Sequence, residues 1–240
     1  MNAVEASGLE LRAGGRSVFS GIDLEAPVGS MVVVRGRSGA GKTSLLLTLA
    51  GRMRATSGGL RVLGEELPGR AGAVRRRVAL AEVRGVNDLD DALTVEQHVA
   101  ERLVLHQPWY RPWVSKDQVA EQIARVERAV AVTAETGADV PALRPREFVS
   151  DIDPLERMAL GVVLALIGRP DVIVVDDVDS LRRSEDRRRA WESLSALRHT
   201  SAIPLTVLAS CSDTSDIRWH AGDDRILIDL QDSPATEGAS

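Results

Sequence analysis

Short apolar segments separated by glycine and proline turns fill the first third of the chain. Runs of this length are typical of β-strands, whereas the longer apolar stretch that follows Lys42 is typical of a helix. We expect the first three strands to form hairpins. The pattern predicts strands at Gly8–Arg12, Ser17–Leu24, Met31–Arg35, Leu60–Leu63 and Val78–Val83, and a helix from Lys42 to about Arg54.

Helical spacing of apolar residues begins after Asn87. Thr94 and Gln97 form one capping-box sequence, and Ser115 and Gln118 form a second, so a helix is expected to begin after each. Strand patterns are missing up to Asp153. The middle of the chain therefore reads as a helical insertion.

Helices and strands alternate in the last third of the chain. Asp153 and Pro154 suit the N-cap and first position of a helix, and Glu156 completes a capping box. The continuous apolar run Val172–Val175 is typical of a strand buried in a parallel sheet. A further helix is predicted at Ser184–Leu197, and further strands at Thr206–Ser210 and Arg225–Leu230.

Composition and charge limit the classes of partner. Hydrophobic residues make up 44% of the 240 residues, and the net charge of −5 gives no overall attraction to nucleic acid, so we expect no nucleic-acid partner. The sequence has no apolar run of membrane-spanning length and no signal-peptide pattern, and Cys211 is its single cysteine. These features predict a cytoplasmic protein.

A glycine-rich turn lies between the strand Met31–Arg35 and the helix after Lys42. It satisfies G-x-x-x-x-G-K-[ST], the Walker A or P-loop pattern, in the required strand-turn-helix context. Backbone N–H groups of such a turn bind phosphate, the lysine reaches the β and γ phosphates, and the Thr43 hydroxyl can ligate Mg²⁺. An ordinary strand-to-helix turn is the alternative. The residues expected to bind nucleotide are Gly36, Arg37, Ser38, Gly39, Ala40, Gly41, Lys42, Thr43 and Ser44.

Two carboxylates follow the apolar strand Val172–Val175. An aspartate at the C-terminal end of a strand beside a P-loop holds Mg²⁺, which is the Walker B arrangement. We assign Asp176 to the metal, together with Thr43. A strand-ending Asp-Asp turn without a ligand is the alternative.

The order of these elements resembles the ATP-binding cassette (ABC) ATPase family over roughly residues 4 to 230. Three phrases carry the resemblance: GLELRAGGRSVFSGIDLEAPVGSMVVVRGRSGAGKTSLL, TSGGLRVLGEEL and LALIGRPDVIVVDD. The resemblance implies ATP and Mg²⁺ as cofactors and a membrane permease subunit as partner. It also implies a homodimer, or a heterodimer with another cassette, held peripherally at the inner face of the membrane.

The implied fold class is α/β. A P-loop NTPase core of mostly parallel sheet flanked by helices carries an N-terminal antiparallel β part and an inserted helical subdomain. Residues 1–86 form the N-terminal part of the nucleotide-binding core with the P-loop, and residues 87–158 form the helical subdomain. Residues 159–230 complete the core with the Walker B strand, and residues 231–240 form a disordered tail.

Several positions depart from the family pattern. The signature L-S-G-G-Q, which the family presents to the nucleotide of the opposite subunit, falls here on the segment Ile152–Glu156. Asp153 places a negative charge near the γ-phosphate, and Pro154 has no N–H to donate. Asp177 replaces the catalytic glutamate and is the candidate catalytic residue, with a carboxylate about 1.5 Å further back. Ser212 replaces the switch histidine of the family, and Glu82 replaces the Q-loop glutamine. Ala13 replaces the aromatic residue that stacks on adenine.

Three of the seven aromatic residues, Trp109, Tyr110 and Trp113, lie together between the two predicted helices of the insertion. They either dock a partner or close the core of the insertion. The sequence thus predicts the ATP-binding subunit of an ABC-type transporter, with weak or absent intrinsic hydrolysis. The alternative is a nucleotide-gated regulatory or scaffold protein of the same fold that does not hydrolyse ATP.

Overall fold

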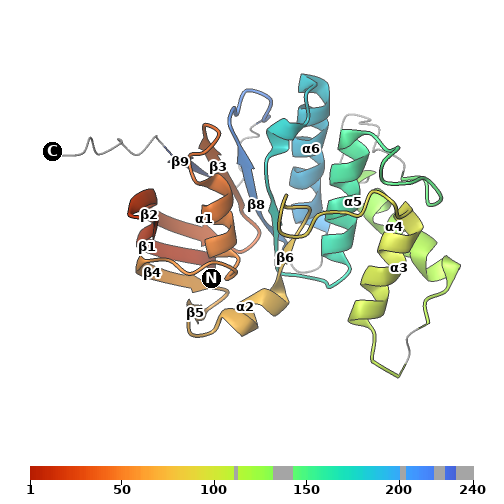
Figure 1. Cartoon of the computed structure of the whole chain (residues 1–240), viewed down its shortest axis with the longest axis horizontal. Coiled ribbons are helices and arrows are strands. Elements are labelled where there is room, and N and C mark those ends of the chain that lie inside the picture. Colours follow the sequence, from red (N-terminus) through yellow and green to blue (C-terminus); the bar gives the residue numbers. More distant parts are fainter. Residues whose placement is uncertain (111–112, 132–142, 201–203, 219–224, 231–240) are drawn as a thin grey trace.

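The computed structural model describes residues 1–110, 113–131, 143–200, 204–218 and 225–230. The predicted tail at 231–240 lies outside the described residues. Figure 1 shows an antiparallel sheet at one end of the molecule, a parallel sheet with helices in the middle, and a pair of helices at the other end. The chain therefore separates its β-rich and purely helical parts on either side of the parallel sheet.

The antiparallel sheet has the strand order β2-β1-β4-β5. The predicted first hairpin is confirmed, because β1 and β2 pair antiparallel across Gly14 and Gly15, which both have positive φ. The short strand β5 was not predicted, since its three residues Glu-Glu-Leu carry no strand pattern. The bounds are Asn2–Ala13 for β1, Arg16–Pro27 for β2, Ser57–Val62 for β4 and Glu65–Leu67 for β5.

The parallel sheet has the strand order β6-β7-β8-β3-β9. The expectation that Met31–Arg35 pairs in a hairpin is wrong: this segment is β3, which pairs in parallel with β8 and β9. Its four apolar residues are buried on both faces, which is typical of a central parallel strand. The bounds are Met31–Gly36 for β3, Val78–Leu80 for β6, Val172–Val175 for β7, Thr206–Cys211 for β8 and Arg225–Leu230 for β9.

Side chains on the two faces of the parallel sheet enter two different hydrophobic clusters. Val32 and Val34 join a cluster with α1 (Lys42–Leu49) and the antiparallel sheet. Met31 and Val33 join a second cluster on the opposite face, which includes α5 (Pro154–Leu166) and α6 (Ser184–Thr200). Alternate side chains of β3 therefore pack against different layers, so the parallel sheet lies between the two.

Helix α1 is shorter than predicted. It ends at Leu49 rather than near Arg54, because Gly51 adopts φ 67° and closes a Schellman motif. In this motif the Gly51 N–H donates to Thr48 O at 3.0 Å, and the Arg52 N–H donates to Leu47 O at 2.9 Å. The short helix α2 (Ala71–Arg77) was not predicted as a helix.

Helices α3 (Val95–His106) and α4 (Lys116–Ala131) form the helical end of the molecule in Figure 1. Both predicted capping boxes are present: the Thr94 hydroxyl accepts from the Gln97 N–H, and the Ser115 hydroxyl accepts from the Gln118 N–H. Among the described helices, none is both long and apolar enough to cross a membrane.

Candidate functional site

The P-loop turns from β3 into α1, and Lys42 is the first residue of the helix. The Lys42 side chain is buried, and its ammonium group donates to Gly36 O at 2.7 Å and to Arg37 O at 2.9 Å. An ammonium group has three N–H donors, and these contacts use two of them. The loop thus holds the lysine in place with one donor left for an anion.

Two glycines of the loop are required by its geometry. Gly41 has φ 88°, and a Cβ atom there would lie 2.5 Å from Val18 O. A Cβ atom at Gly36 would lie 2.9 Å from Leu230 O. Both positions therefore admit only glycine, which lets the turn lie close to its neighbouring strands.

The two predicted metal ligands lie in direct contact. The Thr43 hydroxyl donates to Asp176 Oδ2 at 2.6 Å, although the two residues belong to α1 and to the end of β7. Ser210 on β8 donates from its hydroxyl to the other oxygen, Asp176 Oδ1, at 2.5 Å. Hydroxyl and carboxylate oxygens suit Mg²⁺, so Thr43 and Asp176 fit a magnesium site, with Ser210 orienting the carboxylate.

Asp177 adopts a backbone conformation that is rare for residues other than glycine, with φ 52° and ψ 58°. Its N–H donates to Ser210 Oγ at 2.9 Å, so one hydroxyl contacts both aspartates. Burial, followed by the charges of Asp176 and Asp179, raises the pKa of Asp177 above its ordinary value. A carboxyl group with a raised pKa in a cleft is a common feature of functional sites.

A cavity of about 1430 Å³ joins these groups. The predicted residues that line it are Ser38, Gly39, Gly41, Lys42, Thr43, Ser44, Asp176 and Asp177. Gly36 and Arg37 instead direct their carbonyl groups at Lys42, and Ala40 packs against a hydrophobic cluster. Val18 also lines the cavity, and Ser210 supports it; neither was singled out from the sequence, because no local motif marks either residue.

Comparison with known proteins decides the family. Residues 19–180, more than half of the chain, match the family described as ABC transporter. The chain belongs to the ABC transporter family. Solved ABC cassettes have the same fold: the dimeric bacterial cassette MJ0796 aligns over 95% of this chain and 94% of its own with a TM-score of 0.70 at 15% identity. The same cassette bound to ADP and phosphate gives a TM-score of 0.71 at 17% identity.

Curated ABC relatives are ATP-binding proteins of different transport systems. The aliphatic sulfonates import ATP-binding protein SsuB 1 of Mesorhizobium japonicum is 28% identical over 93% of this chain and 77% of its own length. The Nod factor export ATP-binding protein I of Cupriavidus metallidurans is 29% identical over 77% of this chain and 55% of its own length. The chain thus spans little more than half the length of the second relative.

The segment at the ABC signature position forms the start of α5. It lacks the serine and the two glycines of the family signature. Asp153 Oδ1 accepts the N–H groups of Leu155 at 2.8 Å and Glu156 at 2.9 Å, which completes the predicted capping box. Asp153 and Pro154 are exposed. The exposed end of this ABC cassette therefore shows a carboxylate and a proline at the signature position.

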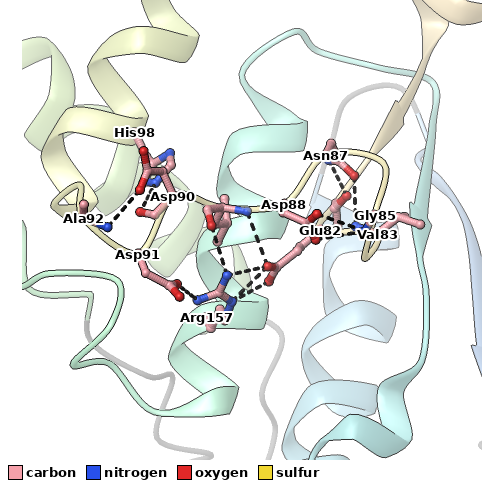
Figure 2. A network of polar contacts seen from close by, with 12 residues as sticks. Glu82, Val83, Gly85, Asn87, Asp88, Asp90, Asp91, Ala92, His98 and Arg157 are labelled. Carbon is pink, nitrogen blue, oxygen red and sulfur yellow. Dashed lines mark hydrogen bonds and ion pairs between the residues drawn. The ribbon is translucent and has the colours of Figure 1, made fainter.

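Glu82, at the Q-loop position, forms an ion pair with Arg157 of α5. Figure 2 shows the guanidinium group contacting both carboxylate oxygens, at 2.7 to 2.9 Å, and also Asp91 at 2.5 Å. Ser212, at the switch position, donates its backbone N–H to the Asp179 carboxylate. Arg157 and Asp179 were not predicted as partners, since each lies far in sequence from the residue it contacts.

Proposed function

We propose that this chain is the ATP-binding subunit of an ABC-type membrane transporter and binds Mg-ATP with weak or absent intrinsic hydrolysis. The contact geometry of Lys42, beside the Thr43 and Asp176 pair, is the observation that supports nucleotide binding most strongly. Lys42 and the N–H groups of the P-loop would hold phosphates, and Thr43 with Asp176 would hold Mg²⁺. The metal would neutralise charge on the β and γ phosphates.

Weak hydrolysis follows from the groups at the catalytic positions. Asp177 is one methylene shorter than the glutamate of the family pattern, and its left-handed backbone is bonded to Ser210. Ser212 offers no imidazole, and the Asp153 carboxylate caps α5. Each group is poorly suited to position water or to hold the γ-phosphate of a partner subunit.

A non-hydrolysing regulatory or scaffold protein is the second candidate. The ion pair between Glu82 and Arg157 favours it, because the carboxylate at the Q-loop position is bound to α5. Mixed-dimer turnover separates the two: a transporter subunit gains activity beside a competent cassette, and a scaffold does not.

The proposed partners are a membrane permease and a second cassette, either identical or different. The solved cassette MJ0796, which has the same fold, is dimeric. Another cassette of this fold, cbiO1 of Clostridium perfringens, is described as part of an ABC transporter complex. The helical subdomain, at residues 87–158 between the two parts of the core, presents Trp109, Tyr110 and Trp113, which are 91%, 64% and 85% exposed. Because these rings are exposed, they do not close the core of the helical insertion. The chain would lie in the cytoplasm, held at the membrane by the permease.

The metal site is tested with Thr43→Val, which removes the hydroxyl group at nearly constant volume. Adding EDTA should weaken ATP binding by the wild-type chain, whereas the variant should bind ATP weakly with or without Mg²⁺. Calorimetric titration measures both. Thr48→Val is the matched control, since the Thr48 hydroxyl bonds to Ser44 O within the same helix. If Thr43→Val keeps the full Mg²⁺ dependence, the metal assignment is wrong.

The aromatic surface is tested with the double variant Trp109→Ala and Trp113→Ala. Because both rings are exposed, the variant should keep the wild-type melting temperature and ATP affinity while losing association with the membrane partner. The chain is co-expressed with a candidate permease subunit, and the amount of the chain in the membrane fraction is measured. Leu227→Ala, which alters an exposed residue on β9, is the control. Unchanged membrane recovery of the double variant would exclude these rings as the docking surface.

A further inference from the structure

The loop that follows β6 is held in one conformation by its own side chains. The Val83 N–H donates to Asn87 Oδ1 at 2.9 Å, and the Gly85 N–H donates to both oxygens of Asp88 at 3.0 Å. Asn87 also donates from its amide to Ala81 O at 2.7 Å, and Figure 2 shows these contacts folding the loop back on itself. The backbone on both sides of Arg84 is therefore fixed.

Arg84 remains available for a ligand. Glu82, the acidic residue nearest to it in sequence, is paired with Arg157, which also contacts Asp91. Arg84 is exposed and makes no hydrogen bond or ion pair within the part of the chain that the structure describes. A guanidinium group carries its charge at all physiological pH values, so this loop presents a permanent cation.

The position of Arg84 relates it to the P-loop. Arg84 lines the same cavity as Gly39, Lys42 and Asp177. Two cations therefore line this cavity, one from α1 and one from the loop after β6.

We propose that Arg84 binds the terminal phosphate of the nucleotide, as a second cation in the cavity that Lys42 lines. This inference rests on the proposed binding of Mg-ATP. Arginine forms paired hydrogen bonds with phosphate oxygens, and a loop already fixed by Asn87 and Asp88 loses little freedom when it binds. Arg84 would supply positive charge at a site where the opposing signature segment carries Asp153.

The test compares ATP with ADP in the presence of Mg²⁺. Arg84→Ala should weaken ATP binding roughly 10- to 100-fold, as expected for a charged hydrogen bond to phosphate, and leave ADP binding within about twofold. Arg84→Lys should recover part of the loss, because lysine keeps the charge without the paired geometry. Arg76→Ala, which removes an exposed arginine of α2 that does not line this cavity, is the control and should change neither affinity.

The outcomes separate this inference from the proposed function. If the wild-type chain binds neither nucleotide, the proposed function fails. If the wild-type chain binds ATP and Arg84→Ala binds it equally well, or loses ATP and ADP to the same extent, the assignment of Arg84 to the terminal phosphate is wrong. Melting temperatures of all variants are measured alongside, and the exposed position of Arg84 predicts no change.

Discussion

The purified chain, with no second cassette present, should release phosphate from ATP at less than about 0.01 s⁻¹, at least roughly 100-fold below an ordinary enzyme rate of about 1 s⁻¹. A general base contributes roughly 10²- to 10⁴-fold when it is well positioned. Asp177 is one methylene shorter than the glutamate of the family pattern, and its backbone N–H donates to Ser210 Oγ. Ser212 has no imidazole group to assist the reaction. The Asp153 carboxylate of an opposing subunit would place a negative charge near the γ-phosphate.

Restoring one group should not restore turnover. Groups that act as a catalytic unit are strongly non-additive, so Asp177→Glu alone should raise the rate only slightly while Asp153 and Pro154 remain opposite. A partner cassette with an intact signature should complete the site on this chain's own P-loop. Turnover should then appear in the mixed dimer.

Steady-state phosphate release is measured for this chain alone and for the mixed dimer. Lys42→Ala in this chain controls for contaminating ATPases. Turnover near 1 s⁻¹ or above by the homodimer, abolished by Lys42→Ala, would show that the departures from the family pattern are tolerated. An inactive mixed dimer would instead favour the regulatory or scaffold function.

Much of the fold could be predicted because the decisive signals are local. The capping boxes at Thr94 and Asp153 were predicted from residue spacing, and both are formed. The end of α1 also has a local signal, because Gly51 suits the left-handed position after a helix. The pairing of β3 depends on segments more than 170 residues away, so the hairpin expectation failed.

In the candidate site too, the features that lie within one segment could be predicted, whereas contacts between distant segments could not. The P-loop is one continuous segment, so its residues and their order could be identified from the sequence. Contacts between distant segments could not: Ser210 to Asp176 and Arg157 to Glu82 each join elements that only the folded sheet brings together. The assignment of Thr43 and Asp176 to one metal was the exception, because the P-loop pattern and the aspartate at the strand end each predict a Mg²⁺ ligand.

Lys42→Ala should have the other large effect, on binding itself. The variant loses the charge-assisted contact to phosphate, which contributes about 1.5 to 3 kcal/mol, or roughly 10- to 150-fold in affinity. It also frees the Gly36 and Arg37 carbonyl groups that the ammonium group now holds. Arg76→Ala is a suitable control, since it removes an exposed cation of α2 that lies outside this cavity.

Calorimetric titration of the wild-type chain and Lys42→Ala with Mg-ATP tests the central claim, that this cassette binds nucleotide through its P-loop. We predict saturable binding by the wild-type chain and an affinity at least about tenfold lower in the variant, which should still melt cooperatively. Equal affinities in the two proteins would contradict the account.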